Sequence, residues 1–146
     1  MIVFDLDGTL ALDHHRRHHL LKDPKDWDSY FRACGDDEPN SALVELVRMI
    51  WWSGGFTLGL WSGRSASVNV ETLGWLDKHQ LTGKFHQTRF RSADDRTEDT
   101  ELKRSWLHQQ NATGDPVTLV FEDRQRVVDM WRSEGITCCQ VAPGDF

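Results

Sequence analysis

The chain has 146 residues, of which 38% are hydrophobic, and a formal net charge of −6. This length predicts one domain over residues 1–146 with a single hydrophobic core. The acidic balance argues against a protein that coats nucleic acid with a basic surface.

Three further features bear on the cellular setting. No stretch approaches the ~18 apolar residues of a membrane span, and the first residues lack the charged and then apolar plan of a secretory signal. The three cysteines, Cys34, Cys138 and Cys139, lack the spacing of a zinc site or of a disulfide framework. We therefore expect a soluble protein of the reducing cytoplasm.

The first apolar run, residues 1–4, predicts a buried strand. It leads directly into Asp5-Leu6-Asp7-Gly8-Thr9-Leu10, where Gly8 predicts a turn. A carboxylate at the end of a buried strand is costly unless a metal or another partner compensates it. Asp-x-Asp alone is equally typical of an acidic turn, whereas the full hexapeptide favours a functional site. Residues 11–40 are polar and irregular, and we expect an insertion there.

From residue 41 onward, the sequence alternates between helical and strand patterns. On the second expected helix, Val68, Leu73 and Leu76 are predicted to face the core. The expected helices are 41–53, 65–79, 100–110 and 125–134, and the expected strands are 56–61, 84–91, 117–121 and 136–141. This alternation predicts an α/β fold: a Rossmann-like parallel sheet of about five strands, helices on both faces, and residues 11–40 as a small cap-like insertion.

Polar side chains suited to phosphate or metal follow three of the predicted strands. Because the carboxyl ends of parallel strands meet at one edge of a sheet, we expect these side chains to lie in one pocket. They are Asp5 and Asp7, Ser62 and Arg64, and Glu122 and Asp123.

In their order along the chain, the hexapeptide, Ser62, Lys103 and the Glu122-Asp123 pair resemble the four motifs of the haloacid dehalogenase superfamily of phosphotransferases. Within that superfamily, residues 61–64 and 122–146 are similar to the 3′-phosphatase domain of phage-type polynucleotide kinase-phosphatases. The resemblance covers nearly the whole chain. It implies an enzyme of nucleic-acid repair.

The resemblance assigns catalytic roles to three residues. Asp5 is the expected nucleophile, because a carboxylate can attack phosphorus to form an aspartyl-phosphate. Asp7 is placed to protonate the leaving oxygen and later to deprotonate the hydrolytic water. Lys103 is expected to offset the growing negative charge, although a helix lysine taken alone is more typical of a solvated surface.

Phosphate and metal ligands follow from the same motifs. Ser62, Gly63 and Arg64 are expected to bind the phosphoryl oxygens together with Lys103. A carboxylate pair repels a phosphate dianion, so a cation is needed, and Mg²⁺ fits oxygen ligands. The expected metal ligands are Asp5, Asp123, the backbone carbonyl of Asp7, and Glu122, which either reaches the metal through water or orients Lys103. Arg124 is expected to pair with the acids that precede it.

The insertion raises the question of specificity. Residues 14–19 form a cluster of histidine and arginine that reads as a solvated face or as a substrate contact. The resemblance implies that Arg16 or Arg17 contacts the substrate. The aromatic residues Trp27, Tyr30 and Phe31 either stack on a base or pack the insertion onto the domain, and packing is favoured.

These observations predict a Mg²⁺-dependent phosphomonoesterase that removes terminal 3′-phosphates, with a nucleic-acid 3′ end or a nucleotide as its substrate. The alternatives are a phosphatase of free 5′-nucleotides or other small metabolites, and a non-catalytic module that binds nucleic-acid ends. The chain contains no Gly-x-x-x-x-Gly-Lys-[Ser/Thr] motif, so no kinase half is expected in it. The intact Asp5, Asp7 and Asp123 argue against the non-catalytic alternative.

Overall fold

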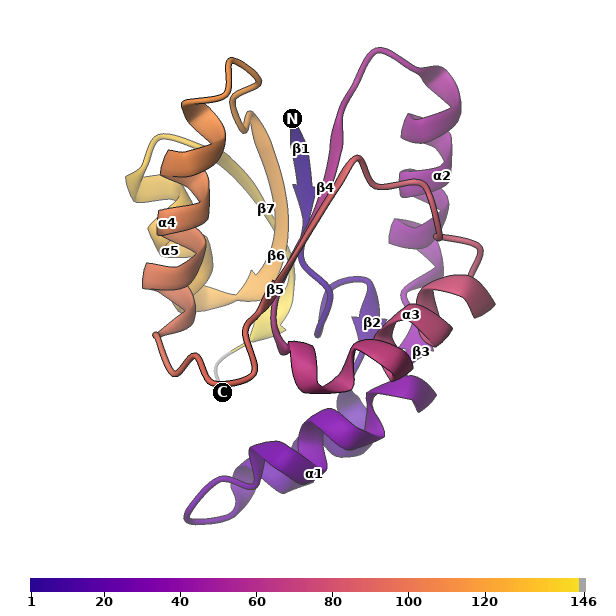
Figure 1. Cartoon of the computed structure of the whole chain (residues 1–146), viewed down its shortest axis with the longest axis vertical. Coiled ribbons are helices and arrows are strands. Elements are labelled where there is room, and N and C mark those ends of the chain that lie inside the picture. The colour runs from indigo at the N-terminus through magenta and orange to yellow at the C-terminus, as the bar shows by residue number, and fades with distance from the viewer. Residues whose placement is uncertain (145–146) are drawn as a thin grey trace.

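The computed structural model describes residues 1–144 and places a parallel sheet at the centre of the molecule (Figure 1). Within these residues the sheet has the strand order β5-β4-β1-β6-β7, and all neighbouring strands are parallel. The strands are β1 (Ile2–Phe4), β4 (Leu58–Ser65), β5 (Gln87–Arg91), β6 (Leu119–Arg124) and β7 (Thr137–Gly144). The predicted α/β fold is confirmed. The last two residues of the C-terminal motif, Asp145 and Phe146, lie outside the described residues.

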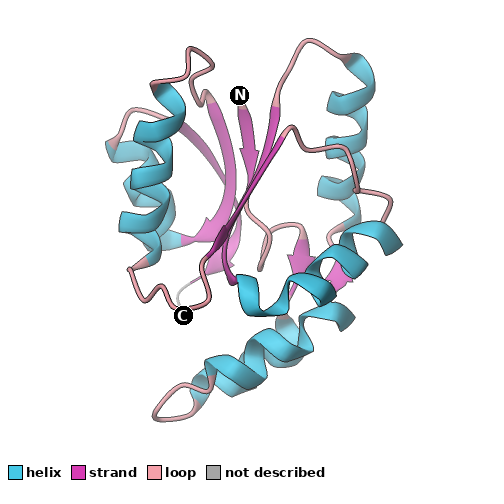
Figure 2. Ribbon diagram, viewed as in Figure 1, coloured by secondary structure: helices cyan, strands magenta, loops and turns pink. Residues whose placement is uncertain are grey.

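Helices cover both faces of the sheet, as the alternating pattern predicts (Figure 2). Helices α4 (Asp99–Asn111) and α5 (Gln125–Ser133) lie on one face, and α2 (Ser41–Ser53) and α3 (Asn69–Lys78) lie on the other (Figure 1). Side chains alternate along a strand between the two faces. Val3 therefore packs with α4 and α5, whereas Ile2 and Phe4 pack with α2 and α3.

Two strands continue past their apolar runs. The expected strand 56–61 extends to Ser65 and the expected strand 117–121 extends to Arg124, because β5 and β7 pair with these polar continuations. The pairing register shifts between Ser62 and Ser65 and again between Glu122 and Arg124. Such irregularities re-aim side chains at the end of a sheet. Both irregularities begin at motif residues, Ser62 and Glu122.

The insertion is more ordered than its polar sequence indicates. Strands β2 (Ala11–Leu12) and β3 (Glu38–Pro39) pair antiparallel at its base, and the chain between them forms a 3-10 helix (His14–Leu21) and the helix α1 (Trp27–Arg32), followed by a second 3-10 turn (Ala33–Asp36). The prediction of an irregular segment was wrong. Short helices held by buried polar contacts leave no 3.6-residue hydrophobic period to detect. Figure 1 shows α1 beyond the carboxyl edge of the sheet.

One predicted core residue points the other way. Val68 and Leu76 are buried as expected, but Leu73 is 58% exposed, and Thr72 and Trp75 face the core instead. The helix begins at Asn69 after a 3-10 turn, which rotates the buried stripe relative to a continuous helix from residue 65. Separately, no helix within residues 1–144 is long and apolar enough to cross a bilayer.

The two leucines of α3 provide a matched test of this packing. We expect Leu76→Ala to lower the free energy of unfolding by about 2–5 kcal/mol, because it removes a fully buried side chain. We expect Leu73→Ala, the same change on the same helix, to stay within about 0.5 kcal/mol of the parent. Urea denaturation followed by circular dichroism measures both values. Equal losses would contradict the assigned orientation of α3.

Candidate active site

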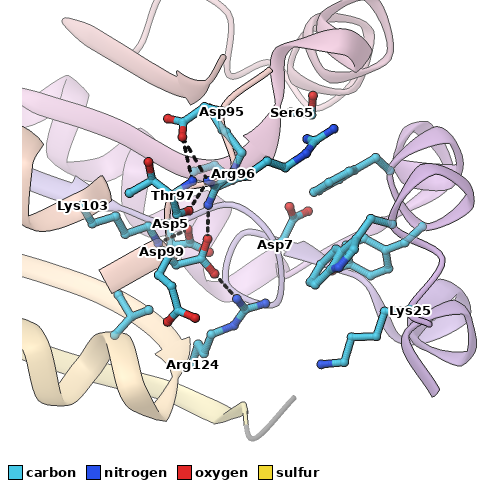
Figure 3. Close-up of a pocket in the computed structure, with 18 of the residues that line it drawn as sticks. Asp5, Asp7, Lys25, Ser65, Asp95, Arg96, Thr97, Asp99, Lys103 and Arg124 are labelled. Atoms are coloured by element: carbon cyan, nitrogen blue, oxygen red, sulfur yellow. Dashed lines mark hydrogen bonds and ion pairs between the residues drawn. The ribbon is translucent and has the colours of Figure 1, made fainter. Parts of the chain in front are cut away.

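The motif residues meet in a cleft of about 720 Å³ at the carboxyl edge of the sheet (Figure 3). They come from the loop after β1, from the ends of β4 and β6, and from the first turns of α4, which are far apart in sequence but adjacent in the parallel sheet. The predicted site residues that line the cleft are Asp5, Asp7, Ser62, Gly63, Lys103, Glu122 and Asp123.

Lys103 joins two of the carboxylates. Its Nζ donates to Oδ1 of Asp5 at 2.6 Å and to Oε2 of Glu122 at 2.7 Å, and the lysine is buried. Although burial alone disfavours its charge, the two carboxylates hold the pKa of Lys103 above its usual value. The other Glu122 oxygen accepts the backbone N–H groups of Asp123 and Arg124, both at 3.3 Å. In this arrangement Glu122 orients Lys103, which is one of the two roles expected for it.

Three buried carboxylates lie close together around Lys103. Asp5, Glu122 and Asp123 each offer an oxygen within 4.8 Å of the others, and all three are buried. Burial and then the charge of Glu122 raise the pKa of Asp5 well above its usual value, and the same causes raise the pKa of Asp123 to about 7. The cluster thus carries unbalanced negative charge. A hard divalent cation with oxygen ligands would balance it.

One carboxylate oxygen of this cluster lacks a hydrogen bond within the described residues. Oδ2 of Asp123 is buried and accepts no hydrogen bond from the described residues, and its cationic neighbour, Nη2 of Arg17, is 3.7 Å away. Gly8 lets the loop after β1 approach this oxygen closely, since a Cβ at Gly8 would overlap it and the backbone φ of +81° favours glycine. The donor set therefore fits a divalent cation.

Two buried arginines hold Asp7. Arg64 donates to it through Nε, at 3.1 and 3.3 Å from the two carboxylate oxygens, and through Nη2, and Arg16 donates through its own Nη2. Burial opposes the charge of Asp7, but Arg64 and then Arg16 outweigh it and hold the pKa of Asp7 well below its usual value. Asp7 is therefore ionised in this arrangement.

Asp37 completes the group. Its two oxygens accept Nε and Nη2 of Arg16, each at 2.6 Å, and Nη2 of Arg64 at 3.1 Å. Sequence reasoning missed Asp37, which lies in the segment expected to be a polar insertion. The signal for it is indirect, because two arginines that share one buried aspartate require a second carboxylate.

This geometry differs from the direct substrate contacts predicted for the arginines. Arg16 and Arg64 are fully buried, lie outside the lining of the cleft, and direct their guanidinium groups at carboxylates. Arg17 is also outside the lining, where its Nε donates to Asp13 at 2.7 Å. Each of the three guanidinium groups thus binds a carboxylate in the described structure, and their contact with substrate stays a prediction.

Asp99 is the second residue that sequence reasoning missed. It is the first residue of α4, and its carboxylate accepts hydrogen bonds from Arg91 and Arg124 and one at 3.5 Å from Arg126 (Figure 3). A Cβ at Gly63 would lie 2.7 Å from Asp99, so glycine there allows this approach. Arg124, expected to pair with the acids before it, binds Asp99.

Comparison with known proteins places this geometry in a family. The family model described as the polynucleotide kinase PNKP phosphatase domain matches residues 1–146. A predicted bifunctional polynucleotide kinase/RNA ligase of Autographa californica nuclear polyhedrosis virus is 28% identical over 131 residues, which are 90% of this chain and 17% of that protein.

Solved structures agree. A chain of the Pnkp1/Rnl/Hen1 RNA repair complex superimposes with a TM-score of 0.82 and 27% identity, over 99% of this chain and 43% of that one. A hydrolase from Streptococcus pneumoniae TIGR4, at 16% identity and a TM-score of 0.66, shares the fold over 97% of this chain and 92% of that one. The chain thus spans less than half the length of the viral relative and of the chain in the repair complex. It belongs to the family of polynucleotide kinase PNKP phosphatase domains, and is a phosphatase domain of the haloacid dehalogenase type.

Proposed function

We propose that this domain is a Mg²⁺-dependent phosphomonoesterase that removes terminal 3′-phosphates from polynucleotides through an aspartyl-phosphate on Asp5. The observation that carries the proposal is the convergence of Asp5, Lys103 and Asp123 in one cleft beside Asp7. The family match supports a polynucleotide substrate, as does the RNA repair complex in which one structural relative was solved.

In the first proposed step, an oxygen of Asp5 attacks phosphorus and the bond from phosphorus to the 3′-oxygen of the nucleotide breaks. Lys103, within 2.6 Å of Asp5, lies where it can bind a phosphoryl oxygen as negative charge develops. Ser62 lines the same wall, and its Oγ already accepts the backbone N–H of Arg64 at 3.2 Å, which fixes its direction. The leaving oxygen takes its proton from Asp7.

In the second step, water attacks the phosphorus of the aspartyl-phosphate and its proton passes to Asp7. The bond between phosphorus and the Asp5 oxygen breaks, so inorganic phosphate departs and the Asp5 carboxylate is regenerated. Arg16 and Arg64 favour the ionised form of Asp7, which is the form that accepts this proton. The first step requires protonated Asp7, and a phosphate dianion in the cleft would raise the pKa of Asp7 by repelling its carboxylate, against the effect of the two arginines.

Asp5 and Asp123, with the backbone carbonyl of Asp7, are the proposed ligands of Mg²⁺, and Glu122 serves mainly to orient Lys103. The ion supplies positive charge that lets a carboxylate approach an anionic phosphate. Oδ2 of Asp123, which accepts no hydrogen bond from the described residues, and the raised pKa values of Asp5 and Asp123 support this assignment.

A substrate comparison tests the proposed specificity. We expect faster turnover, measured as kcat/KM by phosphate release, on a 3′-phosphorylated oligonucleotide than on the same sequence with a 5′-phosphate or on free 5′-nucleotides. DNA and RNA versions of each identify the preferred sugar. A clear preference for 5′-monophosphates would instead favour a nucleotide phosphatase and overturn the 3′ assignment.

Substitution of the two aspartates separates the two steps. We expect Asp5→Asn to abolish phosphate release, because no nucleophile remains. We expect Asp7→Asn to slow turnover by about 10²–10⁴-fold, the usual contribution of a general acid and base, and to leave labelled phosphate bound to the protein. Asp129→Asn, an exposed acid of α5, is the control. Full turnover in either active-site variant refutes its assigned role.

Metal dependence has a direct test that needs no turnover. We expect isothermal titration of Mg²⁺ to detect binding to the parent protein, and Asp123→Asn to weaken it more than about tenfold, the loss typical even of an outer-shell partner. Asp94→Asn, an exposed loop acid, is expected to bind as the parent does. A chelator is expected to stop turnover until Mg²⁺ is restored. Activity undiminished by the chelator contradicts the metal assignment.

A further inference from the structure

The catalytic residues occupy only part of the cleft. A phosphate group fills a small fraction of about 720 Å³, a volume in the range of sites that enclose a whole small-molecule ligand. The insertion forms one part of the remaining wall, through Lys25, Asp26, Trp27, Asp28, Tyr30 and Phe31, and residues 91–99 form another part. The catalytic proposal gives this aromatic wall no role.

The three aromatic residues of this wall fall into two groups. Tyr30 is 1% exposed, its hydroxyl donates to Asp13 at 2.6 Å, and it packs the insertion in the way that sequence reasoning favoured for all three. Trp27 is 37% exposed and Phe31 is half-buried, although both line the cleft. Their rings stack on each other with centroids 5.8 Å apart and an angle of 27°. The stacked pair adds aromatic surface to a charged pocket, and the Nζ of Lys25 lies 5.9 Å from the centroid of the Trp27 ring.

This surface is firmly attached to the catalytic centre. The side chain of Asp26 accepts the backbone N–H of Ser29 at 3.0 Å and so caps α1. The edge of Tyr30 contacts Trp27, with centroids 5.8 Å apart, and the guanidinium of Arg16 lies 4.1 Å from the centre of the Tyr30 ring. The same guanidinium donates to Asp7. A short series of contacts therefore links the aromatic surface to the acid that faces the scissile phosphate.

The opposite wall has a different chemistry. It presents Arg96 and Arg126 among the acids Asp95 and Glu98, together with Arg124 on Asp99, and in Figure 3 the labelled Arg124 and Asp99 lie across the cleft from Lys25. Cationic groups suit a polynucleotide backbone, whereas stacked aromatic rings suit the face of a base. A terminal nucleotide carries both parts, one on each side of its sugar.

We propose that Trp27 and Phe31 are the base-binding surface of this enzyme, on which the base of the 3′-terminal nucleotide stacks while its phosphate lies at Asp5. This inference rests on the proposed function and names a specificity element for it. Stacking on aromatic rings accepts any base, because every base has a π-face. The surface therefore favours nucleotides over other phosphate esters without selecting a sequence.

The test compares a 3′-phosphorylated trinucleotide with the same molecule lacking its terminal base. We expect the parent enzyme to lose about 10- to 100-fold in kcat/KM when the base is absent, the range for one stacked base. We expect Trp27→Ala to lose the same factor on the complete substrate and to hydrolyse the abasic one as the parent does. Trp27→Phe, which keeps an aromatic ring, is expected to retain most of the kcat/KM that Trp27→Ala loses on the complete substrate. Trp52 is a 76% exposed tryptophan of α2, and Trp52→Ala is expected to leave kcat/KM unchanged on both substrates.

Other outcomes are equally informative. If Trp27→Ala slows both substrates alike, or changes neither, Trp27 packs the insertion or is a bystander, and the inference is overturned. Thermal denaturation of each variant shows whether the fold is intact. If the parent prefers 5′-nucleotides, the 3′ assignment fails but the surface is still tested, by comparing a 5′-nucleotide with ribose 5-phosphate in the same variants.

Discussion

The buried charge cluster of Arg16, Arg64, Asp7 and Asp37 is the interaction on which the site depends. Two cations meet two anions, so the group is neutral as a whole, and each arginine contacts both aspartates. Removing one member would leave an unpaired charge in a buried place, which typically destabilises a protein by about 3–5 kcal/mol. Its members come from the insertion, the loop after β1 and the end of β4. The cluster therefore fixes the insertion to the sheet and holds Asp7 at the same time.

The second charged group, formed by Asp5, Glu122, Asp123 and Lys103, differs in balance. It has three acids around one lysine, and burial followed by the charge of Glu122 raises the pKa values of Asp5 and Asp123. A neutral cluster needs no ligand and is suited to support, whereas an unbalanced one is stabilised by a cation from solution. The second group lines the cleft, whereas the first reaches it only through Asp7.

Sequence reasoning recovered the sheet, the helices and the strand-end residues because each leaves a local signal. Apolar runs mark β1, β4 and β6, and the motif residues follow them directly. The missed residues leave no such signal. Asp37 acts through Arg16 and Arg64, 21 and 27 residues away, and Asp99 through Arg124, 25 residues away. Their importance arises only when the fold brings these partners together.

The insertion also depends on contacts between residues that are far apart in the sequence. Its helices are short and are held by buried polar groups such as Asp13, Arg16 and Asp37 in place of an apolar stripe, so its order depends on contacts with the rest of the domain. One of those contacts, Arg16, binds both Asp7 and the backbone carbonyl of Tyr30, at 3.3 Å for the latter. A displacement of α1 would therefore disturb Asp7 as well as the aromatic surface. In the proposed function, this single side chain would couple substrate recognition to proton transfer.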